Sequence, residues 1–348
     1  MSNTRILQGQ PLLRLRSPGD ILAAIPYLIG FHPEESLVVL TLGGDRRRVQ
    51  MGGRIDLPED PRHVRGVATQ LAQTVSWRTS PDEAVVVGYG CAVRVTPAVD
   101  ALRAALVARG VAVREALRAE EGRYWSYECG NPSCCPPEGT PFDVGSSAVA
   151  ARATTEGLVA FSDRGALERS IGPLGGLART VMRQATDRAE ARLLTWLAEC
   201  GEERELRRSM ADQGLPLVHQ ALERHRDGPS LSDDETAWLG VLLKAVRVRD
   251  EAWACVDDER RPAHRALWTH VLRRVEPRYV PAPACLLAVA AWQDGEGALA
   301  GIALDRALQA DPDYSMAHLL DKALRAGLPP SAAYPPMTPQ QLAAAYDE

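Results

Sequence analysis

Three cysteines stand close together in one short segment, and thiols can support more kinds of chemistry than most other side chains. The segment runs GRYWSYECGNPSCCPPEGTPFD, from Gly122 to Asp143, and contains Cys129, Cys134 and Cys135. Thiolates can ligate a metal ion, attack an electrophile or form a disulfide. Ordinary zinc sites use four ligands in two closely spaced pairs, a pattern that this spacing does not follow. Small buried thiols are therefore the favoured interpretation, and the alternatives are a metal site and a redox or nucleophilic thiol.

Two further residues could line a ligand site with these thiols. Trp125 belongs to an aromatic cluster just before the cysteines and could stack on a ligand ring. His32 lies in the loop Gly30–Ser36, before two acids and a serine, although residues so close in sequence seldom form a catalytic triad. No catalytic residue and no cofactor is predicted, and zinc on the three cysteines is the alternative. The candidate ligand-site or thiol residues are His32, Trp125, Cys129, Cys134 and Cys135.

Composition limits the classes of function that the chain can have. With 348 residues, 45% of them hydrophobic, the chain is long enough for two domains with their own cores. The formal net charge of −5 provides no overall basic field, so nucleic-acid binding is not expected. Lys244 and Lys322 are the only lysines, and neither lies in the context G-x-x-x-x-G-K-[ST]. P-loop nucleotide hydrolysis is therefore excluded.

The location of the protein is also constrained by its apolar segments. No window resembles a membrane span, and the first residues lack the apolar core and cleavage site of a signal peptide. We therefore expect a cytoplasmic protein whose cysteines are reduced thiols or metal ligands.

Residues 1–160 are expected to form a mixed α/β domain that ends in the Cys/Pro-rich loop. Ser17-Pro18-Gly19-Asp20 is typical of a helix start, and LVVLTL followed by VQMGGRIDL indicates a hairpin. EAVVVG predicts a central strand, Thr96-Pro97 the start of a helix, and VAVREAL a half-buried strand. Alternating strands and helices together with a hairpin predict one mixed sheet.

Residues 161–348 are expected to form an all-α domain. Helical segments separated by Gly and Pro follow one another from about Leu177. A weak repeat aligns Glu276–Ala282 with Asp311–Ala317 at a spacing of 35 residues. This spacing is one residue longer than the tetratricopeptide period. We predict either a degenerate tetratricopeptide-like repeat near residues 262–326, which we slightly favour, or a helical bundle.

Three segments together resemble one known family. They are LRLRSPGDILAAIPYLIGFHPEESLVVL, RIDLP at Arg54–Pro58 and RYWSYECGNPSCCPPEGTP. These segments are similar to the hallmarks of the actinobacterial domain of unknown function DUF4192. The resemblance implies a cytoplasmic actinobacterial protein, and it brings no activity, substrate, cofactor or functional residue with it.

Two functions follow as hypotheses. The first is a non-catalytic interaction or regulatory protein whose helical domain binds a protein partner, because helix pairs can present a concave surface. The second is an enzyme or a small-ligand or metal-binding protein, with its site where the loops Gly30–Ser36 and Tyr124–Cys135 meet. Neither involves a membrane, and a homo-oligomer is compatible with both.

Overall fold

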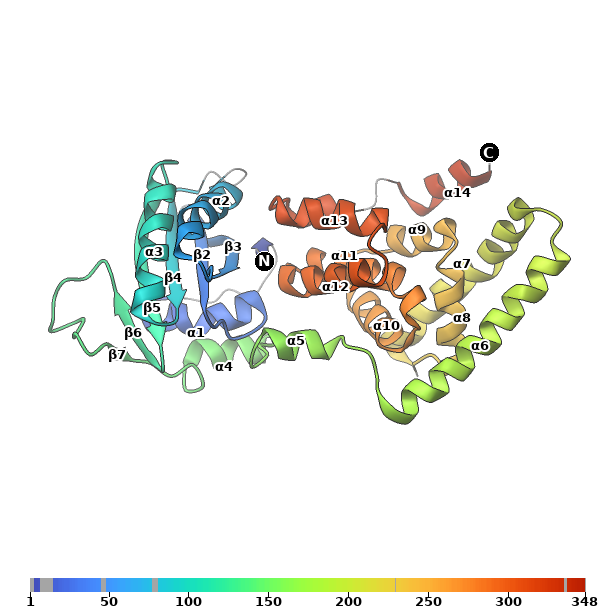
Figure 1. The fold of residues 1–348 in the computed structure, drawn as a ribbon, viewed down its shortest axis with the longest axis horizontal. Helices are drawn as coiled ribbons and strands as arrows, with labels where there is room; N and C mark the ends of the chain where they lie inside the picture. The colour runs from blue at the N-terminus through green and yellow to red at the C-terminus, as the bar shows by residue number, and fades with distance from the viewer. Residues whose placement is uncertain are drawn as a thin grey trace. The chain divides into compact units, whose positions relative to one another are not determined.

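The computed structural model describes residues 3–6, 15–44, 48–76, 81–228, 230–334 and 337–347. The chain divides into two compact units. The first unit contains Met1–Leu167, Gly295–Ala298 and Ala323–Pro329, and the second contains Glu168–Asp294, Leu299–Lys322 and Pro330–Glu348. A sheet organises the first unit, whereas the second is helical (Figure 1).

The strands described in the first unit form one mixed sheet, as predicted. Their order is β1-β3-β2-β4-β5-β6-β7, with β4 and β5 parallel and the other neighbours antiparallel. The predicted hairpin is the pair β2 and β3. The strand bounds are Asn3–Ile6, Ser36–Gly43, Arg48–Asp56, Glu83–Tyr89, Ala112–Glu120, Arg123–Ser126 and Thr140–Pro141 for β1 to β7.

Helices cover both faces of the sheet (Figure 1). On one face, α2 (Val64–Ser76) and α3 (Ala92–Val107) pack on side chains of β2, β3 and β4. On the other face lie α1 (Pro18–Ile29) and α4 (Ala148–Thr155), which contact each other. Because both faces are covered, the central strands are apolar on both sides, and every residue of β2 is buried.

Helix α1 begins where the sequence predicts, but α3 does not. The backbone N–H of Asp20 donates to Ser17 Oγ at 3.1 Å, and the Ser17 N–H donates back to the Asp20 carboxylate at 3.2 Å. The prediction that α3 starts at Thr96-Pro97 is wrong, because the helix starts at Ala92 and includes Pro97. Pro97 has no N–H to donate to the carbonyl four residues earlier, so the helix loses one hydrogen bond. That carbonyl belongs to Val93, which is 85% exposed.

The second unit consists of long and short helices around one central helix, α11. Helices α6 and α7 are the longest, with 24 and 25 residues. Helices α5 (Arg164–Ser170) and α13 (Ser315–Arg325) carry the chain across the boundaries of the units. The remaining helices are α6 (Gly176–Glu199), α7 (Glu203–Asp227), α8 (Asp233–Leu242), α9 (Val246–Ala254), α10 (Arg261–Arg274), α11 (Pro281–Gln293), α12 (Gly297–Ala310) and α14 (Pro339–Asp347), with short 3₁₀ turns at Pro277–Tyr279 and Pro330–Ala333. A further 3₁₀ turn, Pro61–His63, belongs to the first unit.

Every residue of α11 is buried, from Pro281 to Gln293. Helices α9 and α10 and the turn Pro330–Ala333 are among the elements that contact it. A helix of an open repeat normally keeps one face in solvent, so the burial of α11 is more typical of a bundle closed around a core helix. The predicted all-α region is confirmed, and its tetratricopeptide-like packing is not.

No helix in the described parts of the chain combines the length and the apolar character that a membrane crossing requires.

Candidate functional site

The cysteine segment is the loop between β6 and β7, and Trp125 anchors it. The indole N–H of Trp125 donates to the Pro137 carbonyl at 2.9 Å, across the base of the loop. The guanidinium carbon of Arg118 lies 3.6 Å from the Trp125 ring centroid, and Arg118 itself is buried. This cation–π contact holds one side of the ring against the sheet, because Arg118 pairs with Trp125 in the register of β5 and β6.

Further contacts close the loop on itself. Arg123 Nη1 donates to the Gly139 carbonyl at 2.8 Å, and the rings of Tyr124 and Phe142 meet edge to face at 6.2 Å. The hydroxyl of Tyr127 lies 2.8 Å from that of Thr96 on α3. The two ends of the loop are therefore fixed to the sheet and to α3, although the loop itself is at the surface.

A turn centred on Asn131 brings the paired cysteines back over Cys129. The carbonyl of Asn131 accepts the backbone N–H groups of Cys134 at 3.1 Å and of Cys135 at 2.8 Å. Its side-chain oxygen also accepts the N–H of Ser133 at 3.0 Å. An asparagine whose side chain accepts a nearby backbone N–H favours a tight turn. The turn reverses the chain, so that Cys134 and Cys135 meet Cys129, from which an extended strand would separate them.

The three thiols converge. The Sγ atoms of Cys129 and Cys134 are 3.4 Å apart, and those of Cys134 and Cys135 are 3.6 Å apart. All three sulfurs lie within 4.8 Å of one another. A disulfide would need about 2.05 Å between sulfurs. Tetrahedral ligation with Zn–S bonds of about 2.3 Å places sulfurs about 3.8 Å apart, which is close to the observed spacing.

The thiols differ in acidity. Hydrogen bonding from Cys135, then from the backbone at Asn131 and from Cys134, lowers the pKa of Cys129. The same contact with Cys129, aided by burial and by Cys134, raises the pKa of Cys135 to about 12. Cys129 therefore becomes a thiolate more readily than Cys135 does.

The interpretation of these cysteines as small buried thiols is wrong. Cys134 is exposed, and Cys129 and Cys135 are partly exposed. The reason is that the loop projects beyond β6 at the end of the sheet, where no helix covers it (Figure 1). The sulfurs are thus accessible to a ligand from solvent.

His32 is not brought to the thiols. The register aligns Ser36 with Tyr89, Tyr89 with Ala119, and Ala119 with Tyr124. The loop of His32 therefore lies three strand spacings from β6, about 14 Å away across the sheet. The cysteines follow the other end of β6, so the distance along the strands adds to this separation. Burial lowers the pKa of His32, whose backbone N–H donates to the Phe161 carbonyl at 2.9 Å.

Trp125 does lie at the thiol loop, but as its anchor. Arg118 and Asn131, which position the loop, were missed by reasoning from the sequence. The Asn-Pro pair at Asn131 was a turn signal that could have indicated the reversal of the chain. Among the described residues, the metal-capable cluster contains Cys129, Cys134 and Cys135 and no fourth protein donor. Cys91, another cysteine of the first unit, is exposed at the start of α3 and lies outside the cluster.

Comparison with known proteins gives one match. Neither the curated proteins nor the solved structures provide a match to this chain. The family model described as "Domain of unknown function (DUF4192)" matches residues 18–331, which include strands β2 to β7 of the sheet and most of the helical region. The thiol loop lies inside the matched range, as do all five candidate residues. The chain therefore belongs to the DUF4192 family.

Proposed function

We propose that the protein binds a thiophilic metal ion, with Zn²⁺ as the reference case, through Cys129, Cys134 and Cys135. The observation that carries the proposal is the convergence of three sulfurs at 3.4 and 3.6 Å on a surface loop. That spacing is too long for a disulfide and suits thiolates that share one ion.

The anchored base of the loop supports the proposal. Ligands bind a metal tightly when their positions are fixed before binding, because less conformational entropy is then lost. Trp125 and Arg123 fix the loop through bonds to the carbonyls of Pro137 and Gly139. The acid of Glu115 adds a negative field at Cys129, which favours a bound cation.

Three protein ligands would leave one coordination position open to solvent or to a small ligand. Structural zinc sites normally use four protein ligands, whereas sites that bind an exchangeable ligand use three. The exposure of Cys134 agrees with an open position on the solvent side. A zinc ion held here would supply a Lewis-acidic centre for a small anionic or thiol ligand.

The remaining hypotheses stay predictions. Binding of a protein partner by the helical unit would rest on tetratricopeptide-like packing near residues 262–326, and the full burial of α11 lends it no support. The actinobacterial origin and the cytoplasmic location also remain expectations. A cytoplasmic location would keep the cysteines in the reduced form that metal binding needs.

The test is a titration of the purified, fully reduced chain with Co²⁺ as a spectroscopic probe, followed by competition with Zn²⁺. We expect thiolate-to-cobalt charge-transfer absorption that Zn²⁺ abolishes. Each of the three variants in which serine replaces Cys129, Cys134 or Cys135 should bind cobalt at this site at least about 10- to 100-fold more weakly. Metal affinity falls by that factor even when the residue replaced only supports a metal ligand.

Cys91→Ser is the matched control, because Cys91 is an exposed thiol of the same unit that lies outside the cluster. Its cobalt affinity should equal that of the unaltered chain. If the three single variants bind Co²⁺ as the control does, the thiol loop is not a metal site.

A further inference from the structure

A second group of metal-capable side chains lies in the helical unit, where α7 and α9 pack closely. Gly214 of α7 faces Val248 of α9, and a Cβ added to Gly214 would lie only 2.5 Å from Val248 Cγ2. The glycine therefore lets the two helices approach more closely than any other residue would. Five residues further along α7, His219 lies opposite Glu251 of α9.

Three different donor atoms meet there. His219 Nε2 lies 3.5 Å from Glu251 Oε1, and the same oxygen lies 3.9 Å from the Sγ of Cys255. The three donor atoms lie within 4.8 Å of one another. Glu251 and Cys255 are four residues apart, the helical spacing that places two ligands on one face.

Glu251 is a carboxylate that is only 7% exposed. Its described side-chain partners are His219 and the thiol of Cys255, and neither is a permanent cation. An ionised carboxylate in such a place is costly unless a positive charge accompanies it. Glu276, the other carboxylate that is buried among the described residues, does have an arginine partner, because Arg179 pairs with it at 2.8 Å.

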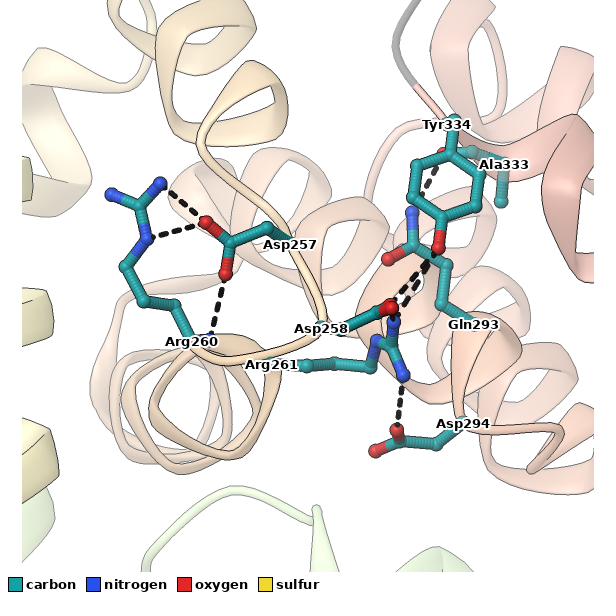
Figure 2. A network of polar contacts seen from close by, with 8 residues as sticks. All are labelled: Asp257, Asp258, Arg260, Arg261, Gln293, Asp294, Ala333 and Tyr334. Carbon is teal, nitrogen blue, oxygen red and sulfur yellow. Dashed lines mark hydrogen bonds and ion pairs between the residues drawn. The ribbon is translucent and has the colours of Figure 1, made fainter. Parts of the chain in front are cut away.

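The turn that carries Cys255 is held firmly by polar contacts (Figure 2). Asp257 accepts the backbone N–H of Arg260 at 2.8 Å and pairs with its guanidinium at 2.6 Å. Arg261 reaches Asp294 at 3.2 Å and the hydroxyl of Tyr334 at 3.4 Å. Asp257 and Arg260, whose charges both act on Cys255, are therefore already paired with each other.

His264 fixes the carbonyl of the same cysteine. Its Nε2 lies 3.2 Å from the Cys255 oxygen, while Trp268 Nε1 donates to its Nδ1 at 3.1 Å. His264 and Trp268 are both fully buried. A donor on a backbone that is fixed in this way has little freedom to move away from its partners.

From this geometry we propose that His219, Glu251 and Cys255 form a second site for a zinc-like divalent cation. Tetrahedral zinc with ordinary bond lengths would separate nitrogen from oxygen by about 3.4 Å and sulfur from oxygen by about 3.6 Å. The observed 3.5 and 3.9 Å require only small shifts. Binding releases the thiol proton of Cys255 to solvent. The side chain of His219 is 46% exposed, so the metal ion can reach the site from solvent at this residue.

The experiment uses the full chain with Cys129, Cys134 and Cys135 all replaced by serine, which removes the thiol loop as a ligand. Titration of this triple variant with Co²⁺ should show one bound equivalent with thiolate-to-cobalt charge-transfer absorption. In that background, His219→Gln should weaken binding at least tenfold, and Cys255→Ser should abolish the charge-transfer band.

The controls are His318→Gln, an exposed histidine, and Cys285→Ser, a buried thiol on α11 outside the cluster. Both should leave the titration unchanged. If Cys255→Ser does not fold, His219→Gln decides, because a half-exposed side chain can be replaced with little effect on folding. A triple variant that binds no Co²⁺, or binding that His219→Gln leaves unchanged, would overturn the second site without affecting the first.

Discussion

The indole of Trp125 lies directly on the backbone of Gly139 at the base of the thiol loop. A Cβ placed on Gly139 would be 2.6 Å from Trp125 Cε2, and the φ of Gly139 is +82°, in the left-handed region. Both facts require glycine at this position. The contact connects the last turn of the loop to β6, and the loop carries the three cysteines.

Replacing Gly139 by alanine should therefore disturb the loop more than the fold. The left-handed backbone alone costs an alanine about 1–2 kcal/mol, and the clash with Trp125 adds to this. We expect a lower cobalt affinity with little change in the global unfolding temperature, because the loop lies outside the core.

Gly130→Ala is the matched control, since its Cβ would meet no atom within 4 Å and its φ is not in the left-handed region. Equal cobalt affinities of the two alanine variants would show that the Trp125 contact does not organise the site.

The order in which the thiols react follows from their acidity. Because its neighbours lower the pKa of Cys129 and raise that of Cys135, iodoacetamide at neutral pH should modify Cys129 before Cys135 in metal-free protein. Excess Zn²⁺ should protect all three thiols of the loop while leaving exposed Cys91 reactive. Peptide mapping by mass spectrometry measures both effects, and modification of Cys135 before Cys129 would contradict the assignment.

Much of the first unit follows from local signals, but the site does not. The Ser17–Asp20 capping box and the hairpin of β2 and β3 depend on neighbouring residues, so sequence patterns predict them. The convergence of the cysteines depends on the Asn131 turn and on Trp125, which reaches Pro137 twelve residues away. Such a contact leaves no periodic pattern in the sequence. The burial of α11 likewise depends on helices that are distant in the chain.

Acid should destabilise the helical unit through His270. Burial lowers the pKa of His270 to about 4, with Arg274 and His225 acting in the same direction. The His225 ring lies 5.3 Å from the His270 ring, and burial also lowers the pKa of His225. As the pH falls from about 6.5 to 4, the unfolded chain takes up a proton at His270 that the folded chain does not, so stability is lost within that window.

After allowance for solvent screening, the loss at His270 should be about 2 kcal/mol. Urea unfolding at pH 7.0, 5.5 and 4.5 measures it, and His270→Gln should show a shallower dependence on pH. The same dependence in both proteins would mean that His270 does not titrate in this way.

Close packing of α7 on α9 should make Gly214→Ala destabilising. Alanine favours a helix by about 1 kcal/mol over glycine, but overpacking against buried Val248 costs about 1–3 kcal/mol. We expect a net loss of stability, together with weaker binding of Co²⁺ by the triple serine variant. Gly66→Ala, in a helix where nothing lies within 4 Å of the new Cβ, should instead be neutral or stabilising. Similar unfolding free energies for the two variants would contradict this account.

The zinc K-edge absorption of the His219→Gln protein, loaded with one equivalent of Zn²⁺, tests the thiol loop most directly. The variant removes a ligand of the second site, so the bound ion reports on Cys129, Cys134 and Cys135. The account predicts three sulfur neighbours at about 2.3 Å and one lighter atom. A zinc ion with one sulfur neighbour or none would contradict it.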